Sequence, residues 1–105
     1  MNVTSQSEMS REDVNRTEGA ILLEFGAGWC EYCRAAQAII ASALAIYPDI
    51  KHIKIEDGKG RVLGRSFSVK LWPTLIFMKN GIEVKRLVRK FDSEEIKLGL
   101  ILIAD

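Results

Sequence analysis

The sequence predicts an α/β protein with a central mixed sheet of four to five strands that is flanked by helices. Two observations support this class. Strand and helix patterns alternate over most of the 105-residue chain, which is typical of parallel βαβ units. An Asn80-Gly81 turn between two apolar runs then predicts a hairpin whose strands extend the same sheet. From the length we expect a single domain over residues 1–105.

The first third of the chain predicts a short helix followed by a buried strand. Ser10 and the acidic residues after it are typical of a helix start, and this helix should end near Gly19. The run Ala20–Phe25 is almost continuously apolar, as expected of a strand covered on both faces, and only Glu24 interrupts it. An edge strand over residues 2–6 would be the fifth strand.

The middle third predicts a long helix, a second strand and a short helix. Apolar residues recur at helical spacing from Ala36 to Tyr47. Alternating apolar residues predict the next strand over residues 50–56. The short helix lies within residues 58–70, and its apolar stripe consists of Val62, Leu63 and Phe67.

The last third predicts the hairpin, with strands over residues 75–78 and 82–88, and a C-terminal helix. Asp92 and Glu95 form a capping box, and the helix should run to about Ile103. Its end, the segment Leu100-Ile101-Leu102-Ile103, is apolar on every face. Such an end either packs one side against the core and exposes the other, or it contacts a partner or a second copy of the chain.

The bulk composition excludes several classes of function. A formal net charge of +1 gives no electrostatic reason to expect nucleic acid, and no apolar run reaches the roughly 18 residues that cross a membrane. The N-terminus lacks a basic region followed by an apolar one, so we expect a cytoplasmic protein. In that reducing compartment two cysteines more often serve redox or metal chemistry than a structural disulfide.

Both cysteines, Cys30 and Cys33, lie in the stretch GAGWCEYCRAA. A zinc site needs four ligands and the chain adds only His52, while a disulfide across so short a loop would stabilise little; inert buried thiols are the remaining alternative. The pair stands where a buried strand ends and a helix begins, and a helix N-terminus stabilises a thiolate. We therefore expect dithiol–disulfide exchange without metal or cofactor, with an exposed nucleophile at Cys30 and a shielded resolving thiol at Cys33.

Three motifs occur along the chain in one order: Trp29-Cys-x-x-Cys, Trp72-Pro73-Thr74 and Leu-Ile-Phe-Met-Lys-Asn-Gly. Together they resemble the thioredoxin family over nearly the whole chain. The resemblance implies the thioredoxin fold, with Pro73 in cis beside the cysteines and a substrate groove shaped by Trp29, Trp72, Pro73 and Thr74. The alternatives are a trans proline that begins an edge strand and a core role for Trp29.

The resemblance places Glu24 where the family has a buried aspartate behind the second cysteine, which takes the proton of that thiol. We expect burial to raise the pKa of Glu24, and its extra methylene to let it reach Cys33 directly. Lys54, or His52 on the same face of its strand, resembles the family's lysine near this acid. The alternatives are a frayed strand end that turns Glu24 to solvent, and a solvated Lys54.

Four positions of the predicted site depart from the family's pattern. Glu31-Tyr32 stands where the family usually has Gly-Pro, and the charge of Glu31 should raise the pKa of the first thiol, whereas Arg34 and the helix end should lower it. Gly26 stands where tryptophan is usual and opens space. Arg89 stands at a usual glycine of the substrate groove and adds a cation to the site.

The sequence therefore predicts a thiol–disulfide oxidoreductase that reduces protein disulfides. Cys30 attacks the substrate disulfide, Cys33 resolves the mixed disulfide and Glu24 accepts the proton. Electrons would come from a disulfide reductase or another dithiol. The alternative is a peptide-binding adaptor or holdase of the same fold, which docks peptides in the groove at Pro73 and has incidental redox activity.

Overall fold

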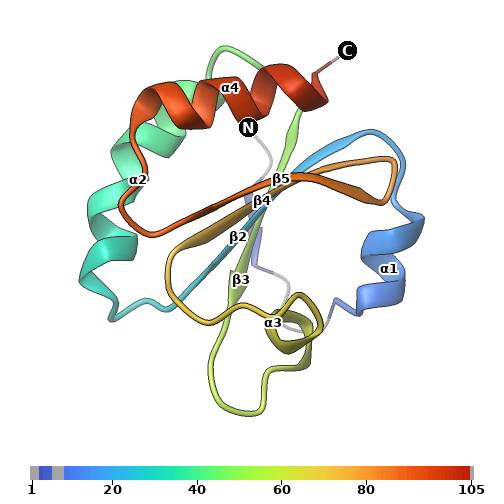
Figure 1. Cartoon of the computed structure of the whole chain (residues 1–105), viewed down its shortest axis with the longest axis vertical. Coiled ribbons are helices and arrows are strands. Elements are labelled where there is room, and N and C mark those ends of the chain that lie inside the picture. Colours follow the sequence, from blue (N-terminus) through green and yellow to red (C-terminus); the bar gives the residue numbers. More distant parts are fainter. Residues whose placement is uncertain (1–2, 6–8, 105) are drawn as a thin grey trace.

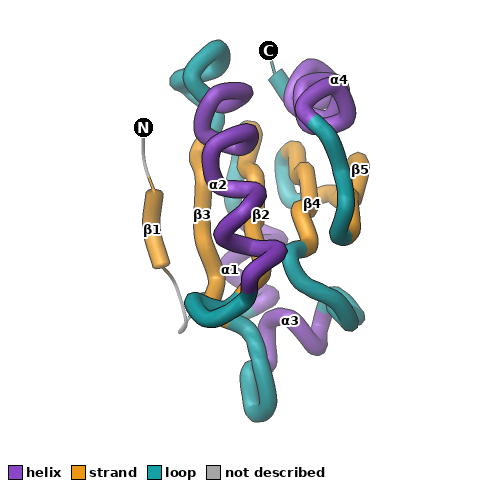
Figure 2. The backbone as a smooth tube through the Cα atoms, turned by 90° about the vertical axis from the view of Figure 1, so that its left-hand side faces the viewer, coloured by secondary structure: helices purple, strands orange, loops and turns teal. Residues whose placement is uncertain are grey.

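The computed structural model describes residues 3–5 and 9–104, which form a five-stranded mixed sheet with the strand order β1-β3-β2-β4-β5 (Figures 1 and 2). The predicted sheet is thus confirmed. The edge strand was predicted over residues 2–6, and its two end residues, 2 and 6, lie outside the described residues. β1, β3 and β2 are parallel; β4 pairs antiparallel with β2, and β5 pairs antiparallel with β4. The strands are β1 (Val3–Ser5), β2 (Ala20–Gly26), β3 (Lys51–Glu56), β4 (Thr74–Lys79) and β5 (Ile82–Val88).

Helices cover both faces of the sheet. α2 (Glu31–Leu44) and α4 (Ser93–Ile103) lie on one face, and α1 (Arg11–Arg16) and α3 (Val62–Ser66) lie on the other (Figure 1). Alternate residues of β2 serve two separate cores, because successive side chains of a strand point to opposite faces. Leu22 packs in the core under α2 and α4, whereas Leu23 packs in the core under α1 and α3. Glu24 has the parity of Leu22 and therefore faces α2.

Local capping accounts for where the helices begin. α1 and α4 start with capping boxes, Ser10 with Asp13 and Asp92 with Glu95, of which the second is the predicted one. At the start of α2 the N-cap is Cys30, whose sulfur accepts a hydrogen bond in the place of the usual hydroxyl or carboxylate. α1 and α2 both end three residues before their predicted ends.

The hairpin between β4 and β5 turns on Asn80 and Gly81, as predicted. Both residues have left-handed backbone angles, with φ of 50° and 79°. These angles are the ones that a two-residue hairpin turn needs, and Asn and Gly tolerate them best. The side-chain oxygen of Asn80 also accepts a hydrogen bond from the N–H of Gly19 (2.8 Å), so the turn is tied to the residue before β2.

The apolar residues of α3 and α4 divide between core and surface, and for α4 this is the first of the two alternatives, a helix end with one side packed on the core. Of the apolar stripe predicted for the short helix, Leu63 and Phe67 are buried, whereas Val62 is 70% exposed. In the C-terminal segment Leu100 and Ile103 belong to the core, and only Ile101 and Leu102 are exposed. No helix in the described part of the chain is long and apolar enough to span a membrane.

Candidate active site

The two cysteines lie at the junction of β2 and α2, as the sequence predicts. Cys30 caps α2 and Cys33 lies in its first turn, and both thiols are free. The backbone N–H of Cys33 donates a hydrogen bond to Sγ of Cys30 (3.3 Å). The expected difference in exposure is wrong, since Cys30 is 5% and Cys33 6% exposed. Any chemical difference between the thiols must therefore come from their electrostatic surroundings.

The surroundings of Cys30 favour its thiolate. Burial raises the pKa of Cys30, but hydrogen bonds from the side chain and backbone of Cys33, a backbone hydrogen bond from Tyr32 and the charge of Arg89 together outweigh this effect. The pKa of Cys30 is therefore lowered, which is the direction that the sequence had left open. The thiolate is the form that attacks disulfides.

The surroundings of Cys33 have the opposite effect. Burial raises its pKa, and the neighbouring Cys30 sulfur and the charge of Glu24 raise it further, to about 11. At neutral pH only about one Cys33 in 10⁴ is ionised at such a pKa. Cys33 is therefore a protonated thiol that needs a base before it can attack.

Glu24 is buried in β2, at 3% exposed, and its carboxylate is fully engaged. Oε1 lies 2.7 Å from Nε2 of His52 on β3, and Oε2 accepts a hydrogen bond of 2.7 Å from Nε2 of Gln37 on α2. Burial raises the pKa of Glu24, but the hydrogen bonds from His52 and Gln37 and the nearby charges of His52 and Lys54 outweigh it. The pKa is lowered, so the expectation of a raised pKa is wrong.

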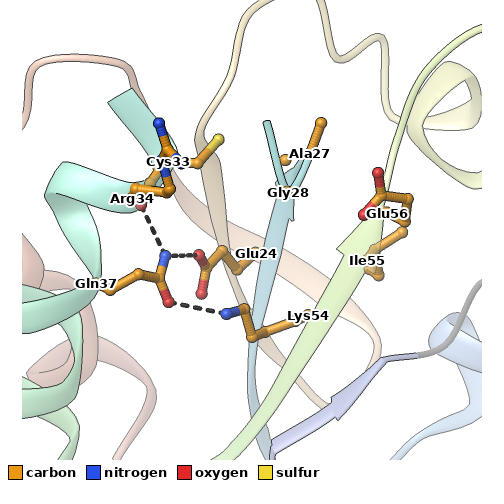
Figure 3. Close-up of a pocket in the computed structure, with 10 residues that line it drawn as sticks. Glu24, Ala27, Gly28, Cys33, Arg34, Gln37, Lys54, Ile55 and Glu56 are labelled. Carbon is orange, nitrogen blue, oxygen red and sulfur yellow. Dashed lines mark hydrogen bonds between the residues drawn. The ribbon is translucent and has the colours of Figure 1, made fainter. Parts of the chain in front are cut away.

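Gln37 connects the acid to its neighbours (Figure 3). Its amide nitrogen also donates to the carbonyl oxygen of Cys33 (2.8 Å), and its oxygen accepts a hydrogen bond from Nζ of Lys54 (2.8 Å). Of the two candidates on β3, His52 contacts Glu24 directly, whereas Lys54 hydrogen-bonds to Gln37 and affects Glu24 by its charge. Within the described residues no hydrogen bond joins the Glu24 carboxylate to the Cys33 thiol, so the expected direct reach is wrong.

Four of the predicted site residues surround a surface hollow of about 440 Å³ at Cys30. We call it the groove; among the residues that line it are Trp29, Cys30, Tyr32, Trp72 and Arg89. The rings of Trp29 and Trp72 meet edge to face with their centroids 5.4 Å apart, and Trp29 is 72% exposed. Nε1 of Trp72 donates a hydrogen bond to Asp57 (2.9 Å), which fixes the indole ring.

Pro73 and Thr74 do not line the groove as the structure describes it. The peptide bond between Trp72 and Pro73 is cis. Thr74 is buried, and its hydroxyl donates to the carbonyl oxygen of Leu71 (2.6 Å). Thr74 is the first residue of β4, so Pro73 joins the groove residue Trp72 directly to the sheet.

Arg89 adds a cation to the groove, as the sequence predicts. Its guanidinium lies over the ring of Tyr32 at 4.4 Å from the centroid, and its Nε donates to the carbonyl oxygen of Trp72 (2.9 Å). The backbone of Arg89 has a positive φ of 21°, a conformation that favours glycine. The contacts of the side chain thus compensate for a backbone position that suits arginine poorly.

The sequence analysis missed Gln37 and Asp57. Gln37 lies four residues after Cys33, so the helical period places both on one face of α2, next to Glu24. That spacing could have identified Gln37. Asp57 follows the end of β3 and reaches Trp72 across a loop, and no local pattern predicts that contact.

Together these residues place a stabilised thiolate, a protonated thiol and an ionised carboxylate within one turn of helix and its neighbouring strand. The first thiol can attack a disulfide, and the second can displace the product once a base accepts its proton. This is the arrangement that dithiol–disulfide exchange requires.

Comparisons with known proteins agree with this geometry. The sequence model of the family described as Thioredoxin matches residues 2–100. The structure of thioredoxin 2 from Pseudomonas aeruginosa in its reduced form is 42% identical with a TM-score of 0.83, and the match covers 95% of this chain and 93% of that one. Thioredoxin NaTrxh from Nicotiana alata has the same fold, with a TM-score of 0.84 at 22% identity and coverage of 99% and 94%.

Among curated relatives, Thioredoxin H5 of Oryza sativa subsp. japonica is 34% identical over 88 residues. The match covers 82% of this chain and 65% of that protein, so the chain spans somewhat less than two thirds of the relative's length. These comparisons give no support to the adaptor or holdase interpretation. The matched sequence model and these relatives show that the chain belongs to the thioredoxin family.

Proposed function

We propose that this protein reduces disulfide bonds in other proteins by dithiol–disulfide exchange at Cys30 and Cys33. The observation that carries the proposal is that the pKa values of two thiols in one helical turn are shifted in opposite directions. The pKa of Cys30 is lowered and that of Cys33 is raised to about 11. Cys30 is therefore the nucleophile, and Cys33 remains a thiol until a mixed disulfide has formed.

In the first step the Cys30 thiolate attacks a substrate disulfide in the groove and expels one substrate sulfur as a thiolate. Trp29 and Trp72 present aromatic faces to the substrate, and Arg89 carries positive charge beside the attacking sulfur. Pro73 and Thr74 link Trp72, a residue of the groove, to the sheet. These roles follow from the position of each residue around Cys30.

In the second step Cys33 attacks Cys30 in the mixed disulfide, which releases the reduced substrate and closes the Cys30–Cys33 disulfide. We assign Glu24 as the base that accepts the Cys33 proton. Its lowered pKa keeps it ionised at neutral pH, and it lines the same cavity as Cys33. Because no direct hydrogen bond joins the two groups among the described residues, the proton travels through that cavity.

The wider expectations follow from the same chemistry. A disulfide reductase or another dithiol supplies two electrons per cycle, and no bound cofactor is needed. Residues 1–105 act as one domain in a cytoplasmic setting, where thiols stay reduced. Self-association through the exposed Ile101 and Leu102 stays a prediction; sedimentation of wild type and Ile101→Lys over a range of concentrations would test it.

Turnover of a protein disulfide with dithiothreitol as electron source tests the proposed function. Wild type should accelerate reduction of the protein disulfide, and Cys30→Ser should abolish the acceleration. Cys33→Ser should stop after the first step and accumulate a mixed disulfide at Cys30. Equal turnover by wild type and Cys30→Ser would contradict the proposal.

A further inference from the structure

The groove is adjoined by a further hollow of about 530 Å³, which lies between the loop that follows β3 and the helix α3 (Figure 1). We call it the basic hollow, because four cationic side chains line it: Lys59, Arg61, Arg65 and Lys70. Trp72 and Lys70 line both the basic hollow and the groove. A peptide chain that lies in the groove can therefore continue into the basic hollow along one surface.

The four cations of the basic hollow are available to a partner. All four are exposed, and none of them forms an ion pair or a side-chain hydrogen bond with another residue that the structure describes. The fold therefore gains no contact from these charges that a bound partner would have to break.

Asp57 is the one acid among the described residues that line the basic hollow, and it is engaged within the protein. Its Oδ2 accepts the hydrogen bond from Nε1 of Trp72 (2.9 Å). The carboxylate also lies against the backbone of Gly64, where a Cβ atom would overlap it. Asp57 thus holds the indole ring between the two hollows and leaves the four cations without a counter-charge of their own.

Positive charge is concentrated around the redox site. Of the described residues that line the groove and the basic hollow, five are cationic and two are acidic. The whole chain, by contrast, has 15 basic and 14 acidic residues. Like charges on one surface repel one another and lower the free energy of unfolding, so an anionic partner accounts for this cluster better than the stability of the fold does.

We propose that the basic hollow is the docking site for an acidic segment of the substrate protein, so that the protein prefers disulfides whose flanking residues are Asp or Glu. The inference rests on the proposed function and adds a substrate class to it. The disulfide lies in the groove at Cys30, and the acidic residues beside it lie beyond Trp72 in the basic hollow.

The two arginines of the basic hollow give the carboxylates their partners. Arginine binds a carboxylate through two parallel hydrogen bonds, which lysine cannot do. Arg61 directly precedes α3 and Arg65 follows one helical turn later, a spacing of about 5–6 Å. Alternate residues of an extended chain are about 6.6 Å apart. Two acids separated by one residue can therefore each meet one arginine.

The first test compares two peptides that differ only in charge. Each has one cysteine in a disulfide with 2-thiopyridine, and attack of Cys30 on the peptide sulfur releases pyridine-2-thione, which is followed by its absorbance. One peptide carries Glu-x-Glu on both sides of the cysteine and the other carries Gln-x-Gln. Rates with 2-mercaptoethanol correct for the intrinsic reactivity of each peptide.

At low salt the acidic peptide should react about tenfold faster than the neutral one, because opposite charge accelerates encounter. The ratio of the two rates should fall as salt screens the charges. Equal rates for the two peptides at low salt would overturn the inference.

Variants locate the preference in the basic hollow. Arg61→Gln and Arg65→Gln should each lower the ratio of acidic to neutral rates about two- to threefold, the effect of one exposed charge pair. Lys51→Gln is the matched control, because Lys51 is exposed and begins β3, at the opposite end of the parallel strands from the cysteines. An equal fall in Lys51→Gln would assign the preference to the net charge of the chain and overturn the docking site.

A competition experiment distinguishes a segment of chain from a free anion. The acidic peptide with serine in place of cysteine should slow the reaction of the acidic disulfide peptide, and less so in Arg61→Gln/Arg65→Gln. Inorganic phosphate at the same ionic strength should not slow it. Equal inhibition by phosphate would identify a site for small anions and overturn the docking of a peptide segment.

The neutral peptide separates this inference from the proposed function. If wild type releases pyridine-2-thione from both peptides at equal rates and Cys30→Ser from neither, only the docking site is wrong. If wild type reacts with neither peptide, the proposed function is wrong and the docking site fails with it.

Discussion

The two sides of the cysteine pair differ in what they are made of. The groove at Cys30 is aromatic and cationic, with Trp29, Trp72 and Arg89 around an accessible hollow. On the side of Cys33 lies a buried polar network. Its centre is the carboxylate of Glu24, which accepts a hydrogen bond from Gln37 with one oxygen and contacts His52 with the other. Both sulfurs are equally covered, so the contrast between them is electrostatic. One helical turn thus separates the sulfur at the proposed substrate groove from the sulfur near the proposed base.

This difference shows how the fold divides the chemistry. The cap of α2 stabilises negative charge on the first sulfur, and a carboxylate on β2 opposes it on the second. The cap of α2 acts on the sulfur of Cys30, and the carboxylate of Glu24 acts on the sulfur of Cys33. Variants that remove one group should therefore change one half of the reaction and spare the other.

The largest expected effect concerns alkylation. At pH 7 iodoacetamide should modify Cys30 at least about 100-fold faster than Cys33, because the thiolate reacts and the pKa of Cys33 is about 11. Peptide mapping after limiting reagent measures the ratio. Comparable rates at the two sites would remove the basis of the contrast.

The next effect is on the second half of the reaction. In Glu24→Gln the mixed disulfide at Cys30 should form at a nearly unchanged rate, and its resolution by Cys33 should slow about 100-fold, since a general base is lost. Glu56→Gln, an exposed acid of the same cavity, is the matched control and should resolve normally. Stopped-flow trapping follows both steps, and resolution at the wild-type rate in Glu24→Gln would exclude this base.

The same substitution should change stability in a pH-dependent way. A carboxyl whose pKa is lowered by folding contributes stability above its unfolded pKa, and that contribution is lost as the pH falls through the folded value. At pH 7 Glu24→Gln should be less stable by about 1–3 kcal/mol, because the charge is lost and one of the two oxygens that face His52 and Gln37 becomes a donor. On acidification the two proteins should converge, as measured by urea unfolding; a constant difference down to the most acidic pH would contradict the lowered pKa of Glu24.

The smallest expected effect concerns Arg89. Arg89→Gln removes a charge that lowers the pKa of Cys30, so this pKa should rise and alkylation at pH 7 should slow about two- to fivefold. Lys90→Gln changes the neighbouring exposed cation and serves as control. A rate unaffected by Arg89→Gln would leave the stabilisation of the thiolate to the hydrogen bonds from Cys33 and Tyr32.

Local signals predicted most of the fold. The Asn80-Gly81 turn and the capping box at Asp92 are encoded within four residues each, and the structure confirms both. The position of the cysteines between β2 and α2 follows from the apolar run before them and the helical period after them. These features needed no knowledge of how distant segments meet.

The site was less predictable because its electrostatics depend on distant partners. The pKa of Glu24 was expected to rise from burial alone, yet His52 and Gln37 come from β3 and α2 and reverse the sign. The register between β3 and β2 places His52 against the carboxylate. This register cannot be predicted from the sequence of either strand alone. Contacts of this kind decide the charge of a buried group, and sequence periodicity does not report them.

The sulfur that performs the chemistry is also a structural element of its helix. As long as Cys30 is a thiolate, it is a strong acceptor for the N–H of Cys33 at the start of α2. A sulfur in a disulfide carries no charge and accepts a hydrogen bond more weakly, so oxidation weakens the cap. The first turn of α2 should then open more often, and amide hydrogen exchange at Cys33 should be faster in the oxidised protein than in the reduced one. The mobility of the first turn of α2 should therefore differ between the oxidised and the reduced protein. Because this turn adjoins the groove, a protein that binds there would meet a more rigid backbone in the reduced state.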